Sequence, residues 1–397
     1  MIMPAASGSS GLDQPDGWLA LTASERGAAH VAVKTPNQDS VAVERAGAGG
    51  IVAAVADGHG HSRHLRSAKG SRFAVSIGCR VGQEFADKLA ADRLDEPTST
   101  VAETEARAEL IVDLATGFIV PTIVARWREA VLADVEAHPF TDAEQGKRRR
   151  GDDPTVAYGS TLLLCVAVAD WLVLAQIGDG DVVAVCADGT ATLPVPVDPQ
   201  LDGLVTTSLC GPHATSDFRI AIVNTTRTPL LATLLATDGY GNAQVVDQWP
   251  SSFSKDLAWL LTERDMRWLA SQLPTWAARC ASADGSADDT TVALLISPAG
   301  QTANGVTAPG GMAGSAAVEP DPGSDEITIP AVTRTDTAPS GWPVSEAPVS
   351  ESQVSAEADQ VTTEHMTTEE SAAAADISRQ ITADWKPPEP PPGSSIR

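Results

Sequence analysis

Residues 160–186 decide the fold class and read S-T-L-L-L-C-V-A-V-A-D-W-L-V-L-A-Q-I-G-D-G-D-V-V-A-V-C. Three apolar, β-prone runs lie within them, at 160–169, 171–177 and 181–186. Links as short as these join antiparallel neighbours, because a parallel pair needs a long crossover. The stretch therefore predicts an antiparallel meander. We expect further strands at 218–223, 230–237 and 290–296.

Working outward, the rest of the chain separates strands from helices. Short β-prone segments lie at 29–33, 40–43 and 51–56. Apolar residues recur at helical spacing in three long segments, 63–89, 105–137 and 254–281. Pro121 should kink or break the second of these helices. Because strands and helices do not alternate, the pattern favours an α+β fold, with antiparallel sheets covered by helices, over a doubly wound fold.

The chain has 397 residues and a formal net charge of -25 at pH 7. Nucleic acids and anionic membranes attract concentrated Lys and Arg, so we expect neither as a main partner. Five widely spaced cysteines without a C-x-x-C pair indicate buried thiols in a reducing compartment and no zinc site. The N-terminus lacks a signal-peptide pattern, and apolar runs such as 161–169 are too short to span a bilayer. We expect a soluble cytoplasmic monomer.

Composition changes sharply after Ser297. Residues 298–397 are rich in Ala, Pro, Ser, Thr and Glu, and they carry 15 acidic and 4 basic residues. Such a segment buries too little apolar surface to offset the entropy of ordering it. We expect a flexible N-terminus at 1–20, one domain at 21–297, and a disordered acidic tail at 298–397. The tail is either an inert solvating segment or a docking segment.

Acidic residues stand at the ends of several predicted strands, beside glycine or small polar residues. They are Asp57, Asp179, Asp238 and the pair Asp288 and Asp289. Taken singly, each fits an ordinary turn or cap. Strand ends lie at the rim of a sheet, where carboxylates from several strands can meet, and Mg2+ and Mn2+ prefer such oxygen ligands. The recurrence predicts a metal site at one sheet edge.

Six short motifs follow one another along the chain. They are N-Q-D-S at 37–40, D-G-H-G at 57–60, G-S-T at 159–161, I-G-D-G-D at 177–181, T-D-G at 237–239 and D-D-T-T-V at 288–292. In this order and spacing they resemble the type 2C metal-dependent protein serine/threonine phosphatases, in their bacterial form. The resemblance covers about residues 28–296. It implies a four-layer α-β-β-α sandwich, in which two antiparallel sheets face each other and helix pairs cover them.

The resemblance also implies a site for two Mn2+ or Mg2+ ions, with a third, weaker ion beside them. By position, Asp57 would bridge the two ions, and the backbone carbonyl of Gly58 would bind one of them. Asp238 and Asp288 would bind the other ion. Asp179 would help to hold the third. Cations in such a site lower the pKa of water and neutralise the phosphate dianion, so that hydroxide can attack without a covalent phosphoenzyme.

Two residues of the D-G-H-G motif are expected to take part in catalysis. Asp57 would do so through the ions that it bridges. His59, two residues later, would act as a general acid that protonates the leaving serine or threonine oxygen. A lone histidine is often structural, but the resemblance favours the catalytic role.

The chain departs from the family pattern beside the expected ligands. Lys34 stands where the family usually has an arginine that grips the substrate phosphate, and lysine keeps the charge but loses the bidentate fork. Gln38 stands where glutamate is common, and Asp289 where asparagine is usual. We place Gln38, Asp39 and Asp289 behind the metal ligands. These departures leave the core acids unchanged.

The sequence thus favours a metal-dependent phosphatase that acts on phosphorylated proteins within a serine/threonine kinase pathway. A second reading is a catalytically weak or inactive module of the same fold that binds phosphoproteins. A third is a metallohydrolase of small phosphate esters. The basic run Lys147, Arg148, Arg149 and Arg150 is either a phosphopeptide-docking patch or an ordinary solvated loop.

Overall fold

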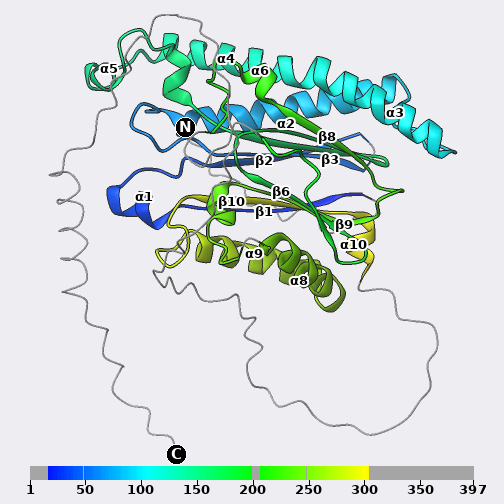
Figure 1. The fold of residues 1–397 in the computed structure, drawn as a ribbon. Coiled ribbons are helices and arrows are strands. Elements are labelled where there is room, and N and C mark those ends of the chain that lie inside the picture. The colour runs from blue at the N-terminus through cyan, green and yellow to red at the C-terminus, as the bar shows by residue number, and fades with distance from the viewer. Residues whose placement is uncertain (1–16, 48, 199–205, 247, 304–397) are drawn as a thin grey trace, which may run out of the picture. The chain divides into compact units, whose positions relative to one another are not determined.

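The computed structural model describes residues 17–47, 49–198, 206–246 and 248–303, whose strands form two antiparallel five-stranded sheets (Figure 1). The first sheet has the order β1-β10-β9-β6-β7 and the second the order β2-β3-β4-β5-β8. The strands are β1 (Leu19–Glu25), β2 (Ser40–Ala46), β3 (Gly50–Ala56), β4 (Leu162–Val168), β5 (Trp171–Ile177), β6 (Asp181–Cys186), β7 (Ala191–Thr192), β8 (Arg219–Asn224), β9 (Leu230–Ala236) and β10 (Thr290–Ile296).

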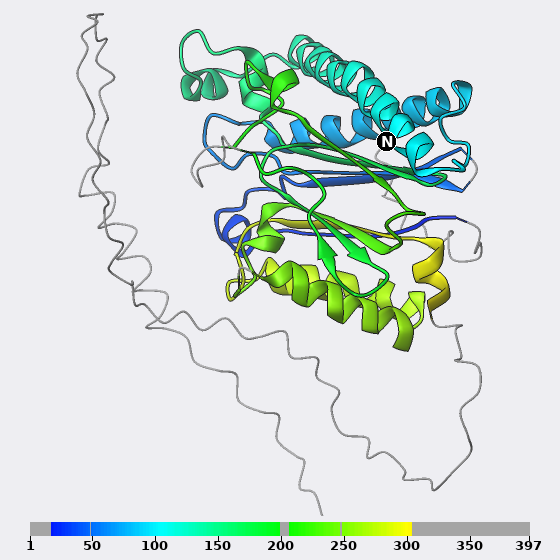
Figure 2. The same ribbon diagram turned by 45° about the vertical axis from the view of Figure 1, so that its right-hand side comes forward.

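Helices cover the outer face of each sheet, so the predicted α+β, four-layer α-β-β-α sandwich is confirmed (Figures 1 and 2). The second sheet is covered by α2 (Ser67–Ala91) and by the consecutive helices α3 (Val101–Leu114), η1 (Ala115–Ile119) and α4 (Val120–Ala137). The first is covered by α8 (Trp249–Glu263) and α9 (Met266–Cys280). The shorter helices are α1 (Ala28–Val33), α5 (Asp142–Lys147), η2 (Pro154–Tyr158), α6 (Ala214–Asp217), α7 (Asp238–Gly241) and α10 (Pro298–Thr302).

The central strands are apolar throughout because both of their faces are buried. In β3, Ile51, Ala53 and Val55 pack into the interior between the two sheets. The alternate residues Val52, Ala54 and Ala56 pack against the helices on the outer face. Side chains alternate between the faces of a strand, so an uninterrupted apolar run is what a strand covered on both sides requires.

The predicted single meander is wrong at β6. Strands β4 and β5 pair as expected, but β6 lies in the opposite sheet, next to β9. The link at 178–180 crosses from one sheet to the other. Gly178 there has a φ of 101°, and a Cβ on it would lie 2.4 Å from the Thr161 side chain, so the crossing requires glycine. The apolar pattern predicts strands but does not tell which sheet each joins.

The N-terminal part of the domain also differs from expectation. Residues 28–33 form helix α1 rather than a strand, and all six of them are at least partly exposed. The strand lies earlier, at β1, where Leu19 pairs with Ile296 of β10. Trp18 is buried beside it. The domain therefore begins before residue 21, within the stretch that we expected to be flexible, whose first 16 residues lie outside the described part of the chain.

The domain extends past Ser297, where we had placed the start of the tail. The Ser297 hydroxyl caps α10, accepting from Gly300 N at 3.0 Å and donating to Leu230 O at 2.5 Å. Gln301 Nε2 donates to Gly17 O at 2.7 Å and so ties α10 to the start of the domain. Residues 298–303 thus belong to the domain. The rest of the predicted tail, 304–397, lies outside the described residues.

Pro121 does not end the second long helix. The chain makes a π-helical turn at η1 and continues as α4 with Pro121 near its start. The wider turn accommodates a residue that has no N–H and would clash with the preceding turn. Among the described residues, the stretch Val101–Ala137 is the one helix long and apolar enough to cross a membrane by length and composition, a weak indication, and 33% of its most apolar window is buried.

The α10 contacts predict where the domain can be cut. A protein truncated after Ala303 keeps the Ser297 cap and the Gln301 bond, whereas truncation after Ser297 removes both. We expect the shorter protein to be less stable by about 2 kcal/mol, from two lost hydrogen bonds and the apolar surface under α10. Urea unfolding of the two proteins measures the difference. Equal midpoints would show that α10 contributes nothing to the fold.

Candidate active site

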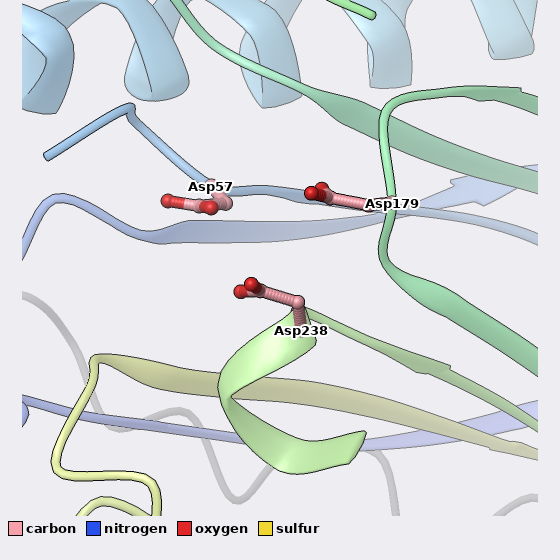
Figure 3. A group of neighbouring side chains, drawn as sticks. All are labelled: Asp57, Asp179 and Asp238. Carbon is pink, nitrogen blue, oxygen red and sulfur yellow. The ribbon is translucent and has the colours of Figure 1, made fainter. Parts of the chain in front are cut away.

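Three carboxylates converge at one end of the sandwich (Figure 3). Asp57 follows β3, Asp179 lies in the link between β5 and β6, and Asp238 begins α7 after β9. Each offers an oxygen, and these three oxygens lie within 4.8 Å of one another. The structure therefore brings together acids that are up to 181 residues apart in the sequence, two from strand ends and one from the crossing between the sheets.

The G-S-T motif fixes the backbone of Asp57. Asp57 N donates to Thr161 Oγ1 at 3.0 Å, and Thr161 N donates to Asp57 O at 2.9 Å. The next residue, Gly58, is buried, and a Cβ on it would lie 2.7 Å from the carbonyl oxygens of both Gln38 and Ser67. A side chain at this position would displace Asp57, so the close approach requires glycine.

Burial and mutual repulsion perturb the acids of this site. Burial, and then the charges of the neighbouring aspartates, raise the pKa of Asp57 well above its ordinary value. The same two causes, burial first, raise the pKa of Asp238 to about 7. Burial likewise raises the pKa of Asp39 to about 8, although Thr237 Oγ1 donates to its Oδ2 at 2.8 Å. The ionised carboxylates are therefore disfavoured, and cations bound among them would offset their mutual repulsion.

The donor atoms suit a hard cation. All of the converging ligands are carboxylate oxygens, which Mg2+ and Mn2+ prefer. Behind them, Asp39 Oδ1 and Gln38 Oε1 are buried and have no hydrogen-bond partner within the described part of the chain. Buried acceptors without donors are rare, and ions or the water around them would satisfy both. The residues present thus fit a metal centre.

Asp288 and Asp289 have different environments. Asp288 is half exposed, lies outside the group of three, and its charge raises the pKa of both Asp57 and Asp238, which places it beside them. Asp289 is buried, and its carboxylate accepts from Gly27 N at 2.8 Å and from Gln38 N at 2.6 Å. Asp289 therefore holds the loop before β2 in place.

His30 of α1 is a residue of this region that the sequence analysis missed. Its Nδ1 lies 2.9 Å from Asp289 Oδ2, and its Nε2 lies 4.0 Å from Asp288 Oδ1. A Cβ on Gly60 would lie 3.8 Å from the same Nε2. Nothing in the local sequence distinguishes this histidine, because its place depends on how α1 folds back against the start of β10.

His59 turns toward the segment before α6. Its Nε2 lies 2.8 Å from Ser208 Oγ, and its N donates to Gly159 O. Burial, and then the charge of His64, lower the pKa of His59 to about 3, so the imidazole is neutral near pH 7 in this structure. Its ring packs edge-on to His64, with 4.9 Å between centroids.

A cavity of about 320 Å³ is lined by two of the three carboxylates, those of Asp179 and Asp238. Asp181 and Asn242 line its polar side, and Trp249 its apolar side. Burial, and then the charge of Asp179, raise the pKa of Asp181 to about 6. Asp181 thus adds a further acidic group to the site, on the side away from Asp57.

The family model for protein phosphatase 2C matches residues 26–276, which include five of the six sequence motifs and all three converging acids. The chain belongs to the protein phosphatase 2C family. It is therefore a metal-dependent serine/threonine protein phosphatase. No curated protein matches the sequence.

Solved structures similar to the chain are distant in sequence. PppA of Pseudomonas aeruginosa, described as a key regulatory component of T6SS, is 17% identical, covers 71% of this chain and 98% of its own, and has a TM-score of 0.41. PstP/Ppp of Mycobacterium tuberculosis, a serine/threonine phosphatase, is 19% identical, with 70% and 98% covered and a TM-score of 0.41. The catalytic domain of PstP in complex with two manganese ions is 19% identical, with 70% and 97% covered and a TM-score of 0.39.

Lys34 and Gln38, two of the three departures from the protein phosphatase 2C pattern, have different environments. Lys34 caps the C-terminus of α1 with a φ of 61° and is exposed, and its ammonium group makes no hydrogen bond or ion pair to a described residue. Gln38 is buried, and its Nε2 donates to Ser67 Oγ. Gln38 thus supports the loop of Gly58 from behind, whereas Lys34 remains a predicted phosphate ligand.

The contacts of Asp289 predict the effect of restoring the family's asparagine. An amide offers one acceptor oxygen, so Asp289→Asn would set an NH2 group against either Gly27 N or Gln38 N. We expect a loss of about 1–3 kcal/mol of stability, the cost of a buried unsatisfied donor. Urea unfolding measures it, with the exposed Asp284→Asn as the control. A variant as stable as the wild type would contradict the bonding described for Asp289.

The raised pKa values predict how the metal-free protein responds to pH. A carboxyl whose pKa rises on folding contributes stability fully below its unfolded value near 3.8, and that stability is lost as the pH rises through the folded value. For Asp238 and Asp39 these values are about 7 and about 8. With a chelator present, we expect the unfolding free energy to fall by more than about 1.4 kcal/mol between pH 5.5 and 8.5.

Two controls accompany this titration of stability. Asp238→Asn removes one of the titrating groups and should flatten the dependence, whereas Asp284→Asn should not. Added Mn2+ should also flatten it, because the cation takes the place of the protons. A metal-free protein that grows more stable toward pH 8.5 would contradict the crowding of these acids.

Proposed function

We propose that this phosphatase hydrolyses phosphoserine and phosphothreonine in proteins, at a site for two Mn2+ or Mg2+ ions centred on Asp57. The single observation that carries the proposal is the convergence of Asp57, Asp179 and Asp238 within 4.8 Å at the rim of both sheets. Bound divalent cations would supply Lewis-acid charge that lowers the pKa of a water and offsets the phosphate dianion. Asp57 and the Gly58 carbonyl would hold the first ion. Asp57, Asp238 and Asp288 would hold the second, and Asp179 a third, weaker one.

The chain's own residues prepare the site before any ion arrives. Thr161 fixes the backbone of Asp57, and Thr237 Oγ1 donates to Oδ2 of Asp39, whose Oδ1 is buried without a hydrogen-bond partner among the described residues. These bonds keep the carboxylates close despite their repulsion. Preorganised charge of this kind makes electrostatic stabilisation effective in the transition state.

His59 is the proposed proton donor to the departing serine or threonine oxygen. Its imidazole is neutral near pH 7 in this structure and its Nε2 lies 2.8 Å from Ser208 Oγ, so the ring can act as an acid only after it gains a proton and the contact with Ser208 opens. A group within reach of the leaving oxygen contributes typically 10²–10⁴-fold as an acid catalyst. Lys34, at the exposed end of α1, is proposed to contact the substrate phosphate.

The proposed substrates are phosphorylated proteins of a serine/threonine kinase pathway, met in the cytoplasm by a monomeric phosphatase. The alternative of an inactive module that binds phosphoproteins would be favoured by loss of a core acid. All four acids, Asp57, Asp179, Asp238 and Asp288, are present in this chain. The active enzyme is therefore the function that the site supports best.

Phosphate release from a phosphothreonine peptide tests the proposal. We expect turnover that needs Mn2+ or Mg2+ and that falls by at least about 100-fold in Asp57→Asn, because the central ligand is lost. The exposed Asp113→Asn on α3 serves as the control and should keep full activity. Wild-type protein without activity at any metal concentration would support the binding-module reading, and equal activity of Asp57→Asn would overturn the site assignment.

A further inference from the structure

Three exposed cations stand together on this strongly acidic chain. Lys147, Arg149 and Arg150 lie at and just after the end of α5, and all three are exposed. Within residues 17–47, 49–198, 206–246 and 248–303, no carboxylate forms an ion pair with any of them, whereas Arg63, Arg66 and Arg128 nearby are paired. We call these three residues the α5 basic surface.

Three of the neighbouring acids are engaged by other bases, and a fourth, Asp142 in the first turn of α5, is exposed. Glu144 receives Arg66, through Nε at 2.8 Å and Nη2 at 2.9 Å. Asp152 lies 3.4 Å from Arg63. Asp153 lies 3.5 Å from Arg128. Positive charge therefore remains at the α5 basic surface after these pairs are formed, in a protein whose net charge is -25.

The position of this surface is fixed rather than left to a free loop. Arg66 also donates to His138 O at 2.7 Å and to Tyr158 OH at 2.8 Å, so one guanidinium ties both ends of the segment around α5. The Phe140 ring lies between two guanidinium groups, 4.4 Å from that of Arg66 and 4.3 Å from that of Arg148. Such bidentate and stacked contacts are the geometry at which arginine is strongest.

The same contacts join the α5 basic surface to the loop of the metal ligands. Arg63 and Arg66 belong to the segment that follows the D-G-H-G motif, and His64 Nδ1 lies 2.5 Å from Val156 O. Seen in both views, α5 lies at the same end of the sandwich as α1 (Figures 1 and 2). The α5 basic surface and Asp57 therefore lie at the same end of the sandwich, where one bound protein segment can reach both.

We propose that the α5 basic surface selects substrates in which acidic or further phosphorylated residues flank the phosphoresidue. The inference rests on the proposed phosphatase function and adds a specificity to it. A preference for acidic peptides would point to this surface, because the net negative charge of the whole chain repels an acidic peptide. A tenfold preference corresponds to about 1.4 kcal/mol, which three exposed ion pairs can supply together.

Two phosphothreonine peptides, one flanked by glutamates and one by glutamines, test the proposal with the full-length protein. At low salt we expect a KM about 10-fold lower for the glutamate peptide, with the same kcat. The triple variant Lys147→Gln, Arg149→Gln, Arg150→Gln should remove the preference. Rising salt should do the same, because exposed charges are screened. The control triple variant Lys255→Gln, Arg267→Gln, Arg279→Gln removes equal charge from exposed sites on α8 and α9 and should keep it.

Unphosphorylated, fluorescently labelled forms of the peptides give a second measurement that does not depend on turnover. Fluorescence anisotropy should show tighter binding of the glutamate peptide to the wild type and to the control variant than to the α5 variant. Equal affinity for the two peptides would overturn the inference even if neither phosphopeptide were hydrolysed. Loss of hydrolysis alone would instead count against the proposed function.

One further outcome identifies a different occupant. If the α5 variant hydrolysed both peptides faster by the same factor, the surface would be holding an acidic segment of the chain itself, such as part of residues 304–397. That result would overturn the substrate preference, because neutral and acidic peptides would gain equally.

Discussion

Carboxylates repel one another, and this chain nevertheless packs three of them within 4.8 Å at the rim of an apolar sandwich. The rest of the domain keeps these carboxylates close together. Thr161, Thr237 and the close approach at Gly58 fix the backbone or the side chains around the acids. The interior of each sheet anchors the strands from which the acids emerge. Metal dependence follows from this one constraint, because cations convert the repulsion into attraction.

The sandwich serves the site because strands of both sheets end at the same place. Asp57 leaves the second sheet, Asp238 leaves the first, and Asp179 lies on the link that passes between them. Further contacts attach two neighbouring segments to the chain that follows Asp57. Ser208 meets His59, and Arg66 ties the segment around α5 to the loop after Gly58. The segment before α6 and the segment around α5 are therefore both fastened to the chain that follows Asp57.

The layers of the fold and the acids of the site could be predicted from the sequence, but their connections could not. Apolar runs followed by Asp-Gly mark strand ends, so Asp57 and Asp238 can be recognised from the sequence alone. The sheet that β6 joins depends on the turn at Gly178, and the pattern of β6 itself is equally compatible with either sheet. The run 29–33 is mostly apolar yet forms α1, in which no residue is buried. The placement of His30 beside Asp288 and Asp289 arises from that helix, and a residue whose role depends on a distant fold contact carries no local signal.

The separation of the two sheets has a consequence for the choice of cation. Asp57 follows a strand of one sheet and Asp238 a strand of the other. The distance between their carboxylate oxygens therefore depends on the thickness of the apolar interior between the sheets. Small residues in that interior, such as Ala53, Ala184 and Ala293, are fully buried. Mg2+ demands ligands at about 2.0–2.1 Å, whereas Ca2+ accepts about 2.3–2.6 Å. These interior residues contact no ion, yet they set the spacing of the two sheets. Bulkier residues in their place would move the sheets apart and would favour larger ions.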